Sequence, residues 1–167
     1  MVSRFLSIIL GLIITVSSSL IYSVPALAIG IDNGYLEPCP SSPNCVISQR
    51  LLRRETTEPA LTVGQDGDED HEIEPIAYQG DRANARESLL KVLSVVPRTK
   101  VIEQTGNYIR SESTSRIFKF VDDVEFYLPE DENVIHVRSA SRVGESDLGV
   151  NRRRIEQIRL AMQDLGV

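Results

Sequence analysis

The chain has 167 residues, of which 24 are acidic and 18 are Lys or Arg, so its formal net charge is −6. A chain of this length usually forms one domain that buries a core without metals or many disulfides. The acidic balance excludes a general nucleic-acid-binding protein and argues against broad contact with an anionic membrane, since both functions need a basic surface.

Residues 1–28 have the features of a secretory leader. Arg4 is their only charged residue, residues 5–20 are almost wholly apolar, and Ala26 and Ala28 are the small residues that a signal-peptidase site requires. This arrangement predicts a signal peptide removed after residue 28, and therefore an exported protein. The alternative is an uncleaved membrane anchor, because the apolar run approaches the roughly 20 residues that span a bilayer.

The remaining chain is predicted to begin with an irregular segment at residues 29–75, which includes an acidic loop. Acidic residues alternate along positions 66–72 in the manner of the first half of a calcium loop. His71 and Ala77 stand where such a loop requires Gly and Glu, so a solvated loop is the favoured interpretation.

The two cysteines of the chain, Cys39 and Cys45, lie in the irregular segment. Two prolines between them favour a turn, which can bring the sulfurs within bridging distance. We predict a disulfide, because an exported protein meets an oxidising compartment. A redox-active pair would need two intervening residues, and His71 and His136 lack the spacing of a zinc site. We therefore expect no metal and no cofactor.

Residues 76–167 are predicted to form an α+β core. Apolar periodicity predicts two helices, at 81–96 and 152–165. It also predicts four strands, at 99–104, 107–113, 117–128 and 134–143. Asp81 and Asn151 are suitable helix caps. The short connections between strands require antiparallel neighbours. The expected fold is a four-stranded antiparallel meander with the two helices on one face.

The strand at 117–128 has an unambiguous inward face with one polar member. Its inward side chains are Phe118, Phe120, Val124, Phe126 and Leu128. Asp122 has the same parity and is therefore expected in a polar network of the core, with Ser141 or Ser139 of the next strand as its donor. The inward residues of that next strand are expected to be Ile135, Val137 and Val143.

The outward face of the same strands is expected to align Arg138 with Asp123 or Glu125. This cross-strand ion pair would contribute well under ~1 kcal/mol if it is exposed to solvent.

Four separate segments resemble the domain of unknown function 1499 (DUF1499) family. They are Cys-Pro-x-Ser-Pro-Asn-Cys at 39–45, Ile-Glu-Pro-Ile at 73–76, Phe-Val-Asp-Asp-Val-Glu-Phe at 120–126, and Arg-Ser-Ala-Ser-Arg-x-Gly-x-Ser-Asp-Leu-Gly-Val-Asn-Arg at 138–152. The resemblance implies an exported or membrane-associated protein of bacteria or plastids, and the leader would suit a cyanobacterial periplasm or a thylakoid lumen. It implies no activity and supplies no catalytic residue.

The segment at 138–154 is the candidate site, because arginines cluster there in an otherwise acidic chain. The candidate residues for an anion or a partner are Arg138, Ser141, Arg142, Asp147, Asn151 and Arg152. Arginines beside a helix N-terminus suit a phosphate, sulfate or carboxylate. The alternative is that these arginines neutralise the acidic residues of the fold.

Two function classes are compatible with these residues. The first is a non-catalytic exported binding or assembly module for an anionic small molecule, a lipid headgroup or a protein partner, which would contact a membrane only through an uncleaved leader. The second is a hydrolase or transferase that uses Asp122, Ser141, Arg138 and Arg142. The adjacent residues Asp122 and Asp123 point to opposite faces of a strand and cannot share one substrate.

Overall fold

The computed structural model describes residues 29–49 and 71–167. The predicted leader and the acidic stretch at 50–70 lie outside these residues. In chain order the elements are β1 (Ile31–Asp32), β2 (Tyr35–Leu36), β3 (Cys45–Ile47), β4 (Ile76–Ala77), α1 (Arg82–Val95), β5 (Thr99–Gln104), β6 (Tyr108–Thr114), β7 (Val121–Tyr127), β8 (Val134–Ser141) and α2 (Val150–Asp164). Neither described helix is long and apolar enough to cross a membrane.

The centre of the fold is one antiparallel sheet in the order β3-β8-β7-β6-β5, with β4 also paired to β8. The α+β class and the consecutive antiparallel pairing of β5 to β8 are confirmed. The expected total of four strands is wrong, because β8 accepts two short strands along its second edge. Cys45 pairs with Ala140 and Ile76 with Ile135. An unpaired strand edge leaves hydrogen-bonding groups open, which explains why part of a segment expected to be irregular is drawn into the sheet.

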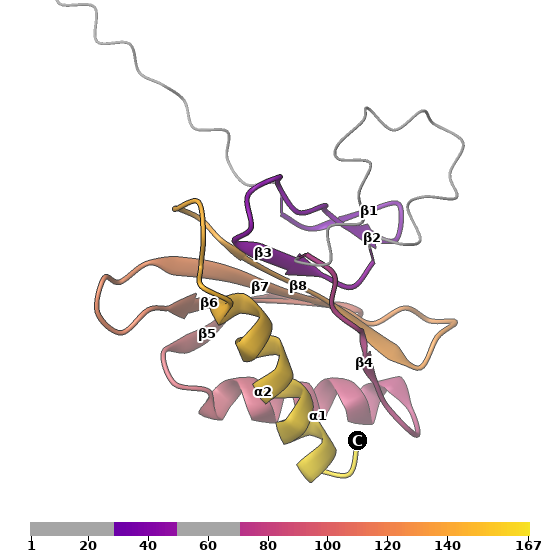
Figure 1. Ribbon diagram of the computed structural model, residues 1–167. Coiled ribbons are helices and arrows are strands. Elements are labelled where there is room, and N and C mark those ends of the chain that lie inside the picture. Colours follow the sequence, from indigo (N-terminus) through magenta and orange to yellow (C-terminus); the bar gives the residue numbers. More distant parts are fainter. Residues whose placement is uncertain (1–28, 50–70) are drawn as a thin grey trace, which may run out of the picture.

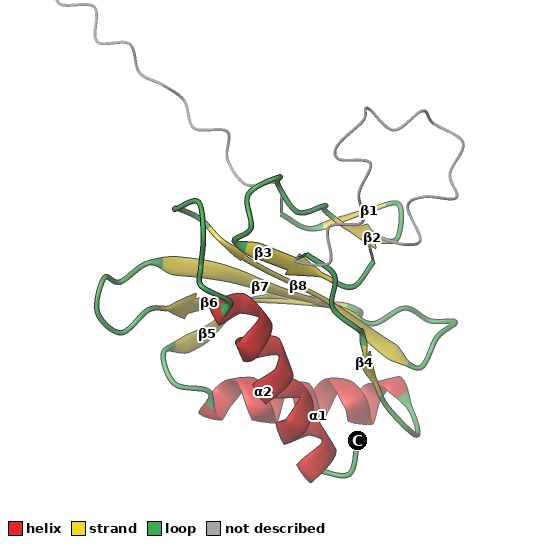
Figure 2. Cartoon of the chain, viewed as in Figure 1, coloured by secondary structure: helices red, strands yellow, loops and turns green. Residues whose placement is uncertain are grey.

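Both helices lie against one face of the sheet, as predicted (Figure 2). Asp81 caps α1, accepting a hydrogen bond of 2.8 Å from the backbone N–H of Asn84. Asn151 does not cap α2, because the helix starts two residues earlier, after Gly149 with its left-handed φ of 74°. The core between the helices and the sheet includes Ala85, Leu89, Leu93, Ile109, Val124, Phe126, Val137, Ile155, Ile158 and Met162.

The N-terminal segment covers part of the opposite face of the sheet (Figure 1). The predicted disulfide is confirmed and joins Cys39 to Cys45 at the start of β3. Leu36, Ile47 and Tyr108 form a second, small apolar cluster on this side. The sheet is thus partly enclosed on both faces, which the sequence analysis did not anticipate.

The two longest predicted strands are shorter than expected. β7 begins at Val121, so Phe118 and Phe120 lie outside it and are exposed rather than part of the core. The backbones of Ser115 and Phe120 close a turn between β6 and β7, through an N–H to carbonyl hydrogen bond of 2.8 Å. Val143 is likewise exposed, because β8 ends at Ser141.

Candidate functional site

Asp122 faces the helices and is buried, opposite Ser141 of β8. The inward position of Asp122 is therefore confirmed, and of the two predicted registers the structure has the one with Ser141. Its hydrogen bond comes from elsewhere, however: Nη2 of Arg154, on α2, donates to Oδ2 of Asp122 at 2.5 Å. Arg154 was not among the candidate residues. Its spacing of three from Asn151, which places both side chains on one face of α2, is the sequence signal that could have identified it.

A fully buried amide connects this pair to the rest of the fold. Oδ1 of Asn151 accepts hydrogen bonds from Ser139 Oγ at 2.6 Å and from Arg154 Nη1 at 2.6 Å. Nδ2 of Asn151 donates to the carbonyl oxygen of Asn44 at 2.8 Å and to Ser141 Oγ at 3.1 Å. The network joins α2, β8 and the loop closed by the disulfide, so its geometry is that of an architectural contact.

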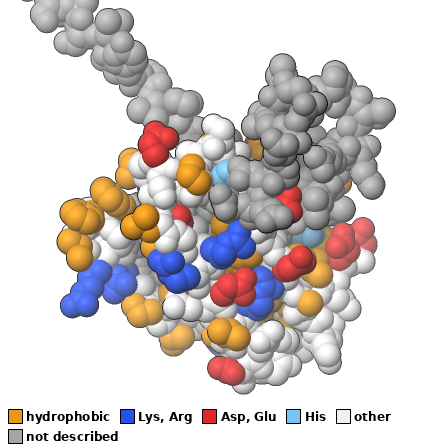
Figure 3. Space-filling model, viewed as in Figure 1, with side chains coloured by type: hydrophobic (Ala, Val, Ile, Leu, Met, Phe, Trp, Pro, Cys, Tyr) orange, Lys and Arg blue, Asp and Glu red, His pale blue; other side chains and the backbone are white. Residues whose placement is uncertain are grey.

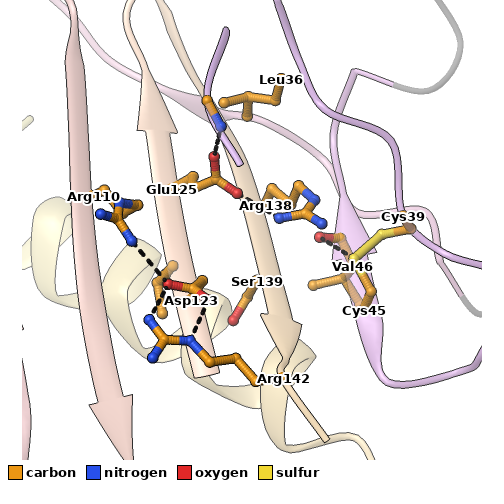
Figure 4. A network of polar contacts seen from close by, with 12 residues as sticks. Leu36, Cys39, Cys45, Val46, Arg110, Asp123, Glu125, Arg138, Ser139 and Arg142 are labelled. Carbon is orange, nitrogen blue, oxygen red and sulfur yellow. Dashed lines mark hydrogen bonds and ion pairs between the residues drawn. A yellow bond between two sulfur atoms is a disulfide. The ribbon is translucent and has the colours of Figure 1, made fainter. Parts of the chain in front are cut away.

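Glu125 and Arg138 form an ion pair on the other face, where Nη1 of Arg138 lies 2.5 Å from Oε2 of Glu125 (Figure 4). The predicted alignment of Arg138 with Glu125 is confirmed, and both side chains are 0% exposed, so the small energy expected for an exposed pair does not apply. Tyr108 and the backbone N–H of Gly30 each donate to Oε1 of Glu125 at 2.8 Å. Burial, together with the adjacent Glu125, raises the pKa of Tyr108 far above its usual value, so its hydroxyl remains a donor.

Arg138 has donors that the ion pair does not use. Among the described residues, its Nε and Nη2 have no hydrogen-bond acceptor although both atoms are buried. In Figure 4 the nitrogens of Arg138 that do not contact Glu125 lie on the side of β3 and the disulfide. A buried donor without an acceptor costs about 1 to 3 kcal/mol, so this edge of the guanidinium is a strong site for an oxygen ligand.

Asp123, also fully buried, is held by two arginines. Arg142 donates to it through Nε at 2.7 Å and Nη2 at 2.8 Å, and Arg110 donates at 3.3 Å. Arg142 also pairs with Glu112 at 2.5 Å. Hydrogen bonds to Asp123 and then to Glu112 raise the pKa of Arg142. Arg142 is thus occupied by carboxylates of the fold itself.

The remaining candidate residues, Asp147 and Arg152, contact different parts of the fold. Asp147 occupies the N-terminus of α2, where its carboxylate accepts from the backbone N–H of Gly149 at 2.9 Å and of Asn151 at 2.6 Å. Arg152 donates to the carbonyl oxygen of Glu72 at 2.7 Å. The structure therefore brings Ser141, Asn151 and Asp147 together at the start of α2. It places Arg138 and Arg142 with carboxylates of the other face of the sheet, so the six candidates do not form one site.

A serine and a histidine that the sequence analysis did not pair lie close together. Ser48 Oγ is 3.3 Å from Nδ1 of His136, and Glu132 is 3.8 Å from its Nε2. Ser48 Oγ also accepts from the backbone N–H of Val137 at 2.8 Å, which continues the pairing of β3 with β8. Desolvation lowers the pKa of His136. With the serine bound to backbone and the carboxylate beyond hydrogen-bond distance, these residues do not form a catalytic triad.

One end of the molecule carries an exposed apolar turn, which we define as residues 115–120 between β6 and β7. Ile117, Phe118 and Phe120 are 78%, 72% and 50% exposed. The two phenyl rings stack with centroids 5.5 Å apart. Figure 3 shows apolar side chains gathered with Lys and Arg at this end. Val143 lies beside the turn, because the backbone N–H of the preceding residue binds the carbonyl of Val121.

The family model of DUF1499, described as a protein of unknown function, matches residues 35–162. No curated protein matches the chain. Within residues 29–49 and 71–167, no group of three or more His, Cys, Asp or Glu side chains could hold a metal ion.

Proposed function

The chain belongs to the DUF1499 family of proteins of unknown function, and we propose that it is an exported, non-catalytic module that docks on an anionic membrane surface. The observation that carries this proposal is the apolar turn, where large apolar side chains stand in solvent beside two basic residues. Scattered apolar residues are normal on a protein surface, whereas a cluster at one protruding end indicates an interaction site.

Hydrogen bonds at the two ends of the turn pair polar backbone groups that would otherwise meet lipid. The backbone N–H of Phe120 donates to Ser115 Oγ at 2.9 Å, and the carbonyl of Phe120 accepts from the N–H of Ser115 at 2.8 Å. Polar backbone groups are costly in hydrocarbon unless they are paired. Each large apolar side chain removed from water would contribute about 1.5 to 3 kcal/mol if fully buried.

The charge of the turn favours an anionic surface over a neutral one. Arg116 and Lys119 flank the apolar side chains, and residues 113–121 contain no acidic residue. Neither basic residue forms an ion pair within the described part of the chain, so both are available to lipid phosphates. A basic residue near an anionic membrane contributes about 1 kcal/mol. This local charge opposes the net charge of the whole chain and would orient the acidic body away from the membrane.

The arginine contacts support a non-catalytic function. Asp122, Asp123 and Glu125 are the buried carboxylates of β7, and each accepts a hydrogen bond from an arginine. A general base must be free to take a proton from a substrate. Using these carboxylates in a hydrolase or transferase would first require the ion pairs of the fold to break.

Export is supported by the leader and by the disulfide, because disulfides persist mainly in oxidising compartments. A periplasm or a thylakoid lumen would meet this requirement, and both are bounded by membranes.

Co-sedimentation with vesicles tests the proposal, using protein purified after export so that all variants share one N-terminus. We expect the parent to sediment with vesicles that contain phosphatidylglycerol and poorly with phosphatidylcholine vesicles. Phe118→Ser combined with Phe120→Ser should abolish binding, and Arg116→Gln with Lys119→Gln should remove the preference for the anionic lipid.

Leu160→Ser is the matched control, since Leu160 is 59% exposed but lies on α2. This variant should bind like the parent. The proposal is wrong if the parent stays in the supernatant with anionic vesicles, or if the Leu160 variant loses as much binding as the phenylalanine variant.

A further inference from the structure

We propose that Arg138 is the binding residue for a small carboxylate, held between the sheet and the N-terminal segment. The proposal is independent of membrane docking, because Arg138 lies on β8 and the apolar turn lies between β6 and β7.

The geometry of the guanidinium identifies the ligand class. In any arginine, Nε and Nη2 lie on the same edge and direct two parallel N–H bonds outward, which matches the two oxygens of a carboxylate. In Arg138 the opposite nitrogen, Nη1, contacts Glu125, whereas this bidentate edge has no acceptor among the described residues. Because the side chain is 0% exposed, bulk water does not satisfy these two donors.

The charge of the surroundings limits the ligand to one negative charge. Glu125 already neutralises Arg138, and its other oxygen accepts hydrogen bonds from Tyr108 and Gly30. A dianion would add two further negative charges beside Glu125 with a single arginine to offset them. Among anions, a monovalent carboxylate satisfies the two free N–H groups with the least added negative charge.

The cover over Arg138, by which we mean the segment with β1 and β2, makes few contacts and is expected to open and admit a ligand. β1 and β2 have two residues each and form a separate two-stranded sheet. Beyond that pairing, the cover is bonded by Gly30 to Glu125 and by two hydrogen bonds with Gln49, one from the N–H of Leu36 and one to the carbonyl of Gly34, and the side chain of Leu36 is buried. Short segments with few contacts open locally at low free energy. The Cys39–Cys45 disulfide keeps the end of this segment attached to β3 during such an opening.

Thermal denaturation of the full exported chain tests the site with sodium acetate as the probe and sodium chloride at equal ionic strength as the reference. We expect Tm to rise with the logarithm of acetate concentration and not with chloride, because a ligand of the native state stabilises it by mass action. Arg138→Lys should lose the acetate response, since an ammonium group can face Glu125 but cannot offer two parallel N–H bonds.

Arg142→Lys is the matched control, because Arg142 lies at the end of β8 and its bonded nitrogens all contact Asp123 and Glu112. It should keep the acetate response of the parent. If Arg138→Lys does not fold, the Nε–H resonance of Arg138 in the parent is followed by NMR during an acetate titration and should shift to saturation. An equal Tm in acetate and chloride, an acetate response retained by Arg138→Lys, or an unchanged Nε–H resonance would each overturn the proposal.

Discussion

At the scale of single residues, the neighbouring carboxylates of β7 are separated by the pleat of the strand and matched with different arginines. Asp122 faces the helices and meets Arg154 of α2, while Asp123 and Glu125 face the other side and meet arginines of the sheet. Buried ion pairs stabilise a fold little compared with apolar residues of the same volume, but breaking one is costly because it leaves an uncompensated charge.

Asp122→Ala should therefore lower the free energy of unfolding by about 3 kcal/mol, because Arg154 would lose its carboxylate partner in a largely buried position. Urea denaturation measures the change. The matched control is Glu130→Ala, which removes the exposed pair with Arg82 and should cost less than about 1 kcal/mol. Equal losses in the two variants would show that Asp122 is not a buried partner.

His136 should make stability depend on pH. Burial lowers its pKa in the folded protein, although Glu132 acts in the opposite direction. The unfolded chain therefore binds a proton first as the pH falls through about 6.5, and stability decreases from there until the folded pKa is reached. Tm measured between about pH 7.5 and pH 5.5 should fall less for His136→Gln than for the parent. Parallel profiles for the two proteins would contradict this assignment.

At the scale of elements, β8 is the centre of the fold. It pairs with β7 on one edge and with β3 and β4 on the other, and its residues contribute to both polar networks. The disulfide joins the loop before β3 to this edge, so it also helps to hold the cover over the Arg138–Glu125 pair.

Replacing both cysteines, as Cys39→Ser with Cys45→Ser, should destabilise the protein by about 2 kcal/mol, since the bridge closes a short loop. The effect should be local. Hydrogen exchange is expected to accelerate at the amides of Gly30 and Leu36, which are bonded to side chains in the cover. Amides of β7 should keep their protection because both of its neighbours remain in place. Faster exchange throughout the sheet would mean that the disulfide supports the whole fold.

At the scale of the whole molecule, charge is distributed unevenly. The chain carries an excess of acidic residues, yet the apolar turn has only basic ones. Net charge alone therefore argued against contact with an anionic membrane, whereas the position of Arg116 and Lys119 beside exposed phenylalanines favours it.

The leader predicts that the exported protein starts at Ile29. Intact mass spectrometry of protein from the exporting compartment should give the mass of residues 29–167 with the Cys39–Cys45 bridge closed. A mass that includes residues 1–28 would show instead that the leader is retained as an anchor.

The sequence by itself determined the elements whose residues contact their near neighbours along the chain. Helical and alternating periodicity predicted both helices and the meander of β5 to β8, and strand parity placed Asp122 inward and opposite either Ser141 or Ser139, of which the structure has Ser141. Short antiparallel connections leave few registers that match apolar faces, which is why this local reasoning succeeded. The resemblance to DUF1499 was likewise visible in four short segments.

Only the tertiary structure decided what lies on the second face of the sheet. Gly30 reaches Glu125 across 95 positions of the chain, and no period in the N-terminal segment predicts that contact. The same long-range packing buries the Arg138 pair, whose exposure the sequence analysis left open, and adds Arg154 to Asp122. Periodicity reports which side of an element is apolar, but it does not report which distant segment will cover a polar side, because that depends on the summed packing of the whole chain.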